Sequence, residues 1–581
     1  MPHNLKMSNN CSEIPASLSH QIKTLLQGED PIKAVELIND DTHLETLKES
    51  SWNIVEIVTP HLTIENAKGN IPLFKACEAI LNIVTEKCKP SETVLELLEE
   101  IDNQENDVKF FTLLKPLKRS LQKLDDKSKS FDWCANTIKY YVDGLPLPDK
   151  EIILEEIDSE ECRIIDVYKE ILLFLKPFIE ESSLDNGKNS KIRNHLLSLL
   201  LSLMGKPFCH LPVCSRSVRD ISESIVINIC KLTGDCFQFL PIVAERDSKS
   251  LNKTSKNNLF ESTWQVSNLS YANFYYLLMT KESLQDKIPQ VYDSEFILQN
   301  CFYLSYIFLE KNIPIFLYKG LGLIESVICR VEKYSLSQQT LELSVHSKLF
   351  SCLTQVMIYC ESDVERKRAL EIFKNYVDLF TIQVKYQVLL HLYKITKHSG
   401  LLSLISVIVK DSIIKCLEVD PPLPYFLGSN LHTLLSIICK LQHGSATDLI
   451  EIAEETIAAL NLIRFLSIRD NNNITGFWDY TENLEKHYLK ELRNGVDLSR
   501  AHWKLKLKDL KEEEKLSKKP KKWEVDNVTV SVGGENLSML PVSEKIEFSH
   551  HALNALDMIE IVLIRVNEFL ENHRLKLAPK N

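Results

Sequence analysis

Apolar residues spaced three and four apart recur along the whole length of this 581-residue sequence. The pattern is plainest near the end, where one stripe on a helix of about seven turns is formed by Phe548, Ala552, Leu556, Ile559, Leu563, Val566 and Leu570. It recurs in 364–380, 431–441 and 457–468. Helices of ordinary length would number roughly 20–25 here, which is more than one hydrophobic core can cover. Stacked helix pairs, each covered by its neighbours, are therefore predicted.

Glycine content supports an all-helical reading. Only 15 of the 581 residues are glycine, a fraction far below the usual level of about 7%. Sandwiches, barrels and phosphate-binding sheets need many tight turns, in which glycine supplies the positive φ angles. Because no strict tetratricopeptide or ankyrin period occurs, we expect an all-α, HEAT-like helical repeat, or α-solenoid, in two halves.

Polar and proline-containing stretches punctuate the pattern. A Ser-, Lys- and Asn-rich stretch predicts a linker at 245–258, between an N-terminal helical-repeat domain at 16–244 and a C-terminal HEAT-like domain at 259–581; residues 1–15 are expected to be flexible. Pro116 and Pro177 lie inside apolar helical patterns and should kink those helices, unless they end them. Alternating valines at Val528–Val532, followed by two glycines, predict a small β insertion.

Motifs for catalysis or metal binding are absent from the sequence. It has no phosphate-binding G-x-x-x-x-G-K-[ST], no H-E-x-x-H and no G-x-S-x-G. Cys209, His210 and Cys214 form a single cluster, whereas zinc needs four ligands, usually from two closely spaced pairs. We therefore expect a non-enzymatic protein with no catalytic residues, cofactor or metal.

Charge, cysteines and hydropathy bear on partners and compartment. The net charge of −12 argues against a nucleic-acid binder, which usually carries a basic excess. The 15 cysteines include no C-x-x-C pair and read as reduced thiols. No apolar run approaches the roughly 18–20 residues of a membrane span. We expect a cytoplasmic monomer with no membrane span.

Two features in the C-terminal half leave alternatives open. The stretch Lys504–Lys522 holds nine lysines and four acids, and is either a solvated helix end with a linker or a patch that contacts acidic partners or phosphates. Trp478 follows a turn-forming run from Asp470 and is either an exposed interface anchor or a residue that pins its loop to the core.

Short segments in collinear order give the sequence a family resemblance. The main ones are Ile457–Asp470 with Thr475–Trp478, Ser51–Ile54, Leu113–Leu117, Lys176–Phe178, His398–Gly400, Val530–Glu535 and Leu556–Glu560. Together these segments, which run from about residue 51 to residue 570, resemble the glomulin family, with the low identity of a distant ortholog.

The resemblance implies a specific function. Members of the glomulin family are all-helical inhibitors of cullin–RING ubiquitin ligases. Their C-terminal half binds the RING domain of the RING-box subunit and occludes the surface where the ubiquitin-conjugating enzyme docks. The resemblance also suggests an FK-binding immunophilin and a receptor tyrosine kinase as partners. A generic helical-repeat scaffold or adaptor for another protein is the alternative.

Residue type and location give the candidate contacts. Hot spots at protein interfaces are commonly aromatic residues or arginines ringed by polar contacts. In the C-terminal half, the partner-binding candidates are Arg464, Asp470, Asn471, Trp478, His502 and Arg565.

Overall fold

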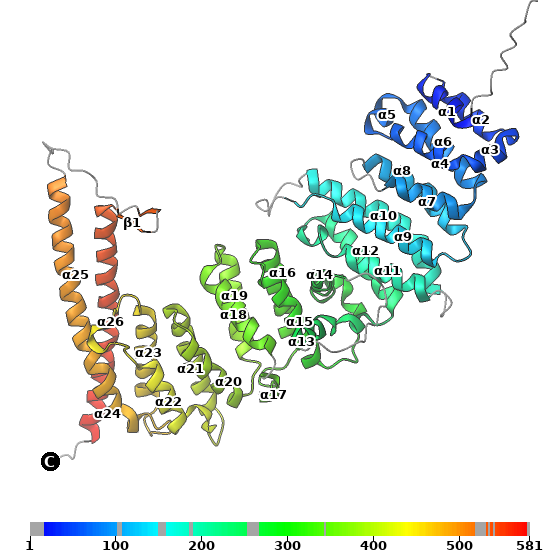
Figure 1. The fold of residues 1–581 in the computed structure, drawn as a ribbon. Coiled ribbons are helices and arrows are strands. Elements are labelled where there is room, and N and C mark those ends of the chain that lie inside the picture. The colour runs from blue at the N-terminus through cyan, green and yellow to red at the C-terminus, as the bar shows by residue number, and fades with distance from the viewer. Residues whose placement is uncertain are drawn as a thin grey trace, which may run out of the picture. The chain divides into compact units, whose positions relative to one another are not determined.

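The computed structural model describes residues 17–28, 30–101, 107–148, 159–184, 190–251, 266–341, 344–517, 530–532, 535–537 and 541–577. Nearly all regular structure in these ranges is α-helix, which confirms the prediction of an all-α fold. The helices fall into two compact units, and Figure 1 shows them stacked within each unit. Unit 1 comprises 1–331 with 344–372, and unit 2 comprises 332–343 with 373–581.

Unit 1 is a succession of stacked helices. Its members are α1 (Leu18–Gln27), α2 (Pro31–Asn39), α3 (Leu44–Glu49), α4 (Ser51–Val58), α5 (Ile64–Gly69), α6 (Ile71–Lys87), α7 (Pro90–Ile101), α8 (Asp107–Gln122), α9 (Ser128–Asp143), α10 (Ser159–Leu184), α11 (Ser190–Leu203), α12 (Arg216–Thr233), α13 (Ile242–Leu251), α14 (Asn268–Thr280), α15 (Ser294–Leu309), α16 (Pro314–Ile328) and α18 (Ser344–Tyr359). Helix α6 contacts α8, α8 contacts α10, and α10 contacts α12, so each helix packs on the next but one, as in a helical repeat.

Both internal prolines of unit 1 lie within helices. Pro116 is inside α8 and Pro177 is inside α10, and each helix continues for more than one turn beyond its proline. The alternative that these prolines end their helices is therefore wrong. Phe110 and Tyr141 stack across α8 and α9 with ring centroids 3.8 Å apart, so the proline-containing helix is held by its neighbour.

The predicted linker at 245–258 begins inside a helix. Residues 245–251 form the second half of α13, whereas 252–258 lie outside the described residues. The polar side chains there find distant partners: Asp247 forms an ion pair with Lys348 at 2.9 Å, and Arg246 donates to the carbonyl of Val266 at 2.8 Å. The compact units divide elsewhere, at 332–343 and after 372. Polar composition predicted a linker here because it does not reveal whether polar side chains form ion pairs and hydrogen bonds within a helix.

Unit 2 carries the C-terminal helices. They are α17 (Gln338–Leu341), α20 (Ile382–Ile395), α21 (Ser399–Leu417), α22 (Gly428–Ile438), α23 (Ala453–Arg469), α24 (Thr481–Leu484), α25 (Lys490–Ser517) and α26 (Val542–Leu577); α19 (Asp363–Val377) spans the division between the units. Helix α21 contacts α23, α23 contacts α26, and α25 packs along α26. This confirms the helical-repeat architecture within the unit.

The predicted stripe near the end of the chain is buried on α26. Its residues from Ala552 to Leu570 are each at most 4% exposed, and they face α23 and α25. Phe548 departs from the prediction, because 55% of it is exposed. The adjacent Ser549 is buried in its place, and the Phe548 ring makes an edge contact with Trp503, with ring centroids 5.5 Å apart.

A short β pair lies between α25 and α26. Strands β1 (Val530–Val532) and β2 (Glu535–Leu537) are antiparallel, with Val530 opposite Leu537. Val528 and the two glycines of the predicted turn lie outside the described residues. The pair is too small to alter the fold class, and the small β insertion near Val528–Val532 stays a prediction.

No single helix in the described ranges is long and apolar enough to cross a membrane; only α12 with the bent continuation Cys236–Asp247 reaches that length and apolarity as a pair, with a bend of 99°.

Candidate partner-binding surface

Asp470 organises the loop that follows α23. It is 3% exposed, and its carboxylate accepts hydrogen bonds from the backbone N–H groups of Ile474 at 2.6 Å and Thr475 at 2.9 Å, and from the Thr475 hydroxyl. An acidic side chain that bridges its own turn in this way replaces the missing helical hydrogen bonds. The buried carboxylate is engaged by its own loop, and the contact of Asp470 with a partner stays a prediction.

Trp478 is pinned by the same loop and by α26. Its indole N–H donates to the Asp470 carbonyl at 2.5 Å, and its ring stacks on His573 with centroids 3.4 Å apart. Trp478 is half-buried as a result. Of the two sequence-based alternatives, these contacts favour the residue that fastens the loop to the core over the exposed anchor.

The other predicted contacts are exposed but lie on different elements. Asn471 is in the loop, His502 is on α25, and Arg565 is on α26, where it pairs with Glu568 at 3.0 Å. Arg464 is on α23 and lines a groove. The structure therefore brings Asp470, Asn471 and Trp478 together in one loop and distributes the remaining three over three helices.

The lysine-rich stretch continues α25 as far as Ser517, which supports its reading as a helix end, while 518–522 lie outside the described residues. Lys506 stands over the face of Trp503, with its ammonium 4.5 Å from the ring centroid. At this distance the cation is attracted to the aromatic face. The N-terminal end of the stretch therefore packs on α25 through the contact between Lys506 and Trp503.

An exposed apolar strip, which sequence reasoning missed, runs along α26 opposite its buried stripe. Met558, Ile561 and Ile564 are 54%, 57% and 49% exposed, and their spacing of three places them in a row. We call these three residues the α26 outer face. The last element of a repeat array ordinarily carries a polar outer surface, because no further repeat covers it. A second stripe at 558, 561 and 564 is readable in the sequence and could have signalled this face.

The charges around the α26 outer face are mutually paired. Arg500 of α25 reaches both Asp557 and Glu560 at 2.8 Å, and Arg565 pairs with Glu568. Apolar contacts ringed by polar groups are the usual composition of an interface hot spot. This surface can therefore bind a shallow apolar patch without burying an unpaired charge.

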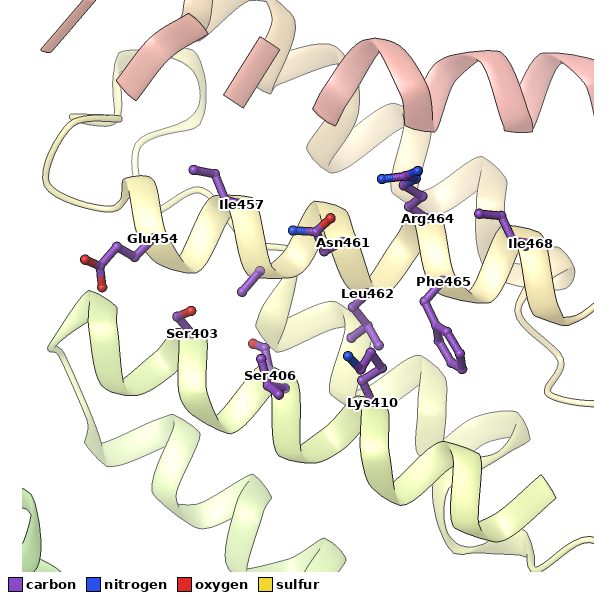
Figure 2. A pocket seen from close by; sticks show the side chains of 12 residues that line it. Ser403, Ser406, Lys410, Glu454, Ile457, Asn461, Leu462, Arg464, Phe465 and Ile468 are labelled. Atoms are coloured by element: carbon purple, nitrogen blue, oxygen red, sulfur yellow. The ribbon is translucent and has the colours of Figure 1, made fainter. Parts of the chain in front are cut away.

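A groove separates α21 from α23. It has a volume of about 590 Å³ and is lined by Ser403, Ser406, Val407, Lys410, Glu454, Ile457, Ala458, Asn461, Leu462, Arg464, Phe465 and Ile468. Figure 2 shows Ser403 and Glu454 at one end and Lys410, Phe465 and Ile468 at the other. We call it the α21–α23 groove. Sequence reasoning found Arg464 but not the groove, because a hollow between two helices depends on which faces pair.

Within the described ranges, no group of three or more His, Cys, Asp and Glu side chains is arranged to hold a metal ion. The Cys209 thiol is buried, and burial raises its pKa to about 11, which leaves it a poor ligand or nucleophile. The stacked helices and the exposed apolar strip instead define the class of an all-helical repeat protein with a surface suited to another protein.

The comparisons with known proteins give the family. Residues 231–529 match the family described as "Uncharacterised protein family, YAP/Alf4/glomulin", and because this is just over half of the sequence, the chain belongs to that family. It is similar to glomulin of Homo sapiens, at 28% identity over 562 residues that cover 94% of this chain and 92% of that protein. It is also similar to glomulin of Mus musculus, at 27% identity with the same coverage. The family resemblance predicted from the collinear segments is confirmed.

The chain is also similar to solved structures. A crystal structure of importin beta aligns with 83% of this chain and 63% of its own length, at 13% identity. The TM-score is 0.21, so this likeness carries no argument about the fold or the function.

Proposed function

We propose that the chain is a non-catalytic inhibitor of cullin–RING ubiquitin ligases. In this proposal its C-terminal helices bind the RING domain of the RING-box subunit and cover the surface where the ubiquitin-conjugating enzyme docks. Membership in the glomulin family supports the proposal. In this role the chain acts in the cytoplasm, which cell fractionation tests.

The α26 outer face is the observation that carries the proposal. Met558, Ile561 and Ile564 present a continuous apolar strip on the last helix of the described array. In this proposal, the docking surface of the RING domain presents a shallow apolar patch to the strip. An inhibitor that masks such a surface needs an apolar counterpart, and a stable interface buries about 1,200–2,000 Å² in total. The rest of that area would come from the neighbouring exposed parts of α25 and α26.

A reconstituted ubiquitination reaction tests the proposal. The full chain is titrated into a reaction that contains a cullin–RING complex, activating enzyme, conjugating enzyme and ubiquitin. We expect ubiquitin transfer to fall as the chain is added and to recover with excess conjugating enzyme, because the two compete for one surface. Unchanged transfer, together with no binding of the RING-box subunit, would leave the chain as a scaffold for some other protein.

A further inference from the structure

The α21–α23 groove exists because small residues face one another across it. Ser403 and Ser406 of α21 and Ala458 of α23 contribute little volume, so the two helices leave a hollow between larger residues on either side. Its floor is apolar and closed: Leu462 is 1% exposed, and the Ser406 hydroxyl is satisfied by the carbonyl of Leu402 at 2.9 Å. A ligand in the groove would therefore place apolar side chains against this floor.

The rims of the groove also carry exposed apolar side chains. Val407 on the α21 side is 40% exposed and Ile468 on the α23 side is 47% exposed, and Ile457 lines the other end. From Glu454 to Ile468 the groove follows α23 for about 20 Å, at about 1.5 Å per residue. This length suits three to four turns of a helix laid along it, which is one of the recurring modes of peptide recognition.

Charge along the groove is polarised. Arg464 and Lys410 lie toward one end, and Glu454 lies at the other, as Figure 2 shows. Among the described residues, Arg464 has no acidic partner, and Lys410 has only its neighbour Asp411 at 3.9 Å. A ligand that brings carboxylates to the Arg464 end would therefore gain charge-assisted contacts that the chain itself does not supply.

The helices that form the groove run in the same direction. The backbone N–H of Glu455, in the first turn of α23, donates to the hydroxyl of Ser399, the first residue of α21, at 3.1 Å. Both N-termini therefore lie at the Glu454 end. A third helix laid antiparallel to them would place its own N-terminus beside Arg464 and Lys410. Acidic residues in that first turn would be favoured both by these cations and by their own helix dipole.

We propose that the α21–α23 groove binds an amphipathic helix of a protein partner, with an acidic first turn, an apolar stripe of three to four turns and a basic last turn. The helix lies antiparallel to α21 and α23. Its stripe covers Val407, Leu462 and Ile468, its acids meet Arg464 and Lys410, and its basic end meets Glu454. This site is separate from the α26 outer face and does not depend on RING-box binding.

Two stapled peptides of 18 residues test the site on the full chain. Both are fluorescein-labelled and carry the same leucine stripe; one has glutamates in the first turn and lysines in the last, and the other has these charges exchanged. Because the staple holds both peptides helical, a difference between their affinities reflects their contacts with the groove. Fluorescence anisotropy should show the acid-first peptide binding at least tenfold more tightly than its exchanged partner.

Variants decide whether the peptides occupy the groove. Ala458→Trp fills the hollow and should abolish binding, whereas the surface pair Lys410→Glu and Arg464→Glu should reverse the preference between the two peptides. Leu173→Glu is the matched control, because Leu173 is similarly exposed and lines a groove between α10 and α12 in unit 1. It should leave binding unchanged.

The proposal is overturned if neither peptide binds at millimolar concentration or if both bind equally. It is also overturned if the charge-reversed pair, shown to be folded by circular dichroism, keeps the wild-type preference. Since Lys410 and Arg464 are surface residues, that pair gives a result even where Ala458→Trp disturbs the helix packing.

Discussion

The indole of Trp478 lies parallel to the imidazole of His573, with ring centroids 3.4 Å apart and planes inclined by 7°. This contact joins the loop after α23 to the last turns of α26. Because the α26 outer face depends on where α26 is held, the loop positions the proposed binding surface without forming part of it.

Trp478→Ala should destabilise the chain and loosen the end of α26. Removing a buried tryptophan costs about 3–5 kcal/mol, and for this half-buried ring we expect about 2 kcal/mol. Denaturant unfolding measures the loss, and hydrogen exchange should report faster exchange around His573. Trp52→Ala is the control, because Trp52 is 45% exposed in unit 1 and should cost little. If Trp478→Ala were as stable as the control yet failed to bind the partner, Trp478 would be a direct contact.

Asp470→Ala should be as costly, because it removes hydrogen bonds within the loop itself. The substitution leaves the N–H groups of Ile474 and Thr475 without their acceptor in a buried turn. Each unsatisfied buried donor costs about 1–3 kcal/mol, so we expect about 2–3 kcal/mol in the free energy of unfolding. The exposed Asp497 provides the control, since Asp497→Ala should change stability by less than about 0.5 kcal/mol. Equal stability of the two variants would contradict the structural role of Asp470.

His346 should make the chain sensitive to mild acid. Burial lowers the pKa of this imidazole from 6.5 to about 4, and the ring meets Phe302 edge-on. As pH falls from 6.5 to 4, the unfolded chain binds a proton that the folded chain resists, so stability is lost in this window. Relative to His346→Leu, the wild type should lose up to about 3 kcal/mol between these pH values. Parallel stability curves for the two proteins would show that His346 does not titrate in this way.

Glu455 should have the opposite dependence. Burial, with a smaller contribution from Glu451, raises the pKa of this carboxyl from 4.5 to about 7. The folded chain therefore holds the proton more tightly than the unfolded chain, and stability falls as pH rises from 4.5 to 7. Glu455→Gln should be more stable than the wild type at pH 8 by roughly 1 kcal/mol, allowing for partial exposure, and no more stable at pH 4.5. The exposed Glu482→Gln should show no such difference between the two pH values.

The helices could be predicted because their spacing reports burial directly. The stripe from Ala552 to Leu570 is buried as expected, since any helix packed on neighbours must hide such a stripe. Phe548 obeys the same spacing but is exposed, because the adjacent Ser549, which is 0% exposed, takes the inward position on that turn. The Asp247–Lys348 ion pair shows a second limit of sequence-based prediction. Its two residues are 101 apart in the sequence, so the sequence does not show that the polar stretch around Asp247 belongs to a packed helix.

The candidate binding surfaces were harder to predict from the sequence than the helices were. Residue type alone singled out Asp470 and Trp478, but the hydrogen bonds that occupy them depend on the geometry of one loop. The α21–α23 groove depends on Ser406 and Ala458 facing one another, which requires knowing that their helices pair. The α26 outer face was the exception, since two opposed apolar stripes on one helix are visible in the sequence itself.

Equilibrium binding of the RING-box subunit to α26 outer-face variants tests the central claim most directly. Ile561→Glu combined with Ile564→Glu places two charges in the strip, and the control Val364→Glu changes an exposed apolar residue of unit 1. Loss of a hot spot costs about 2 kcal/mol or more, so we predict at least a tenfold weaker Kd for the double variant and no change for the control. Wild-type affinity in the folded double variant, or no binding by the wild type, would contradict the account.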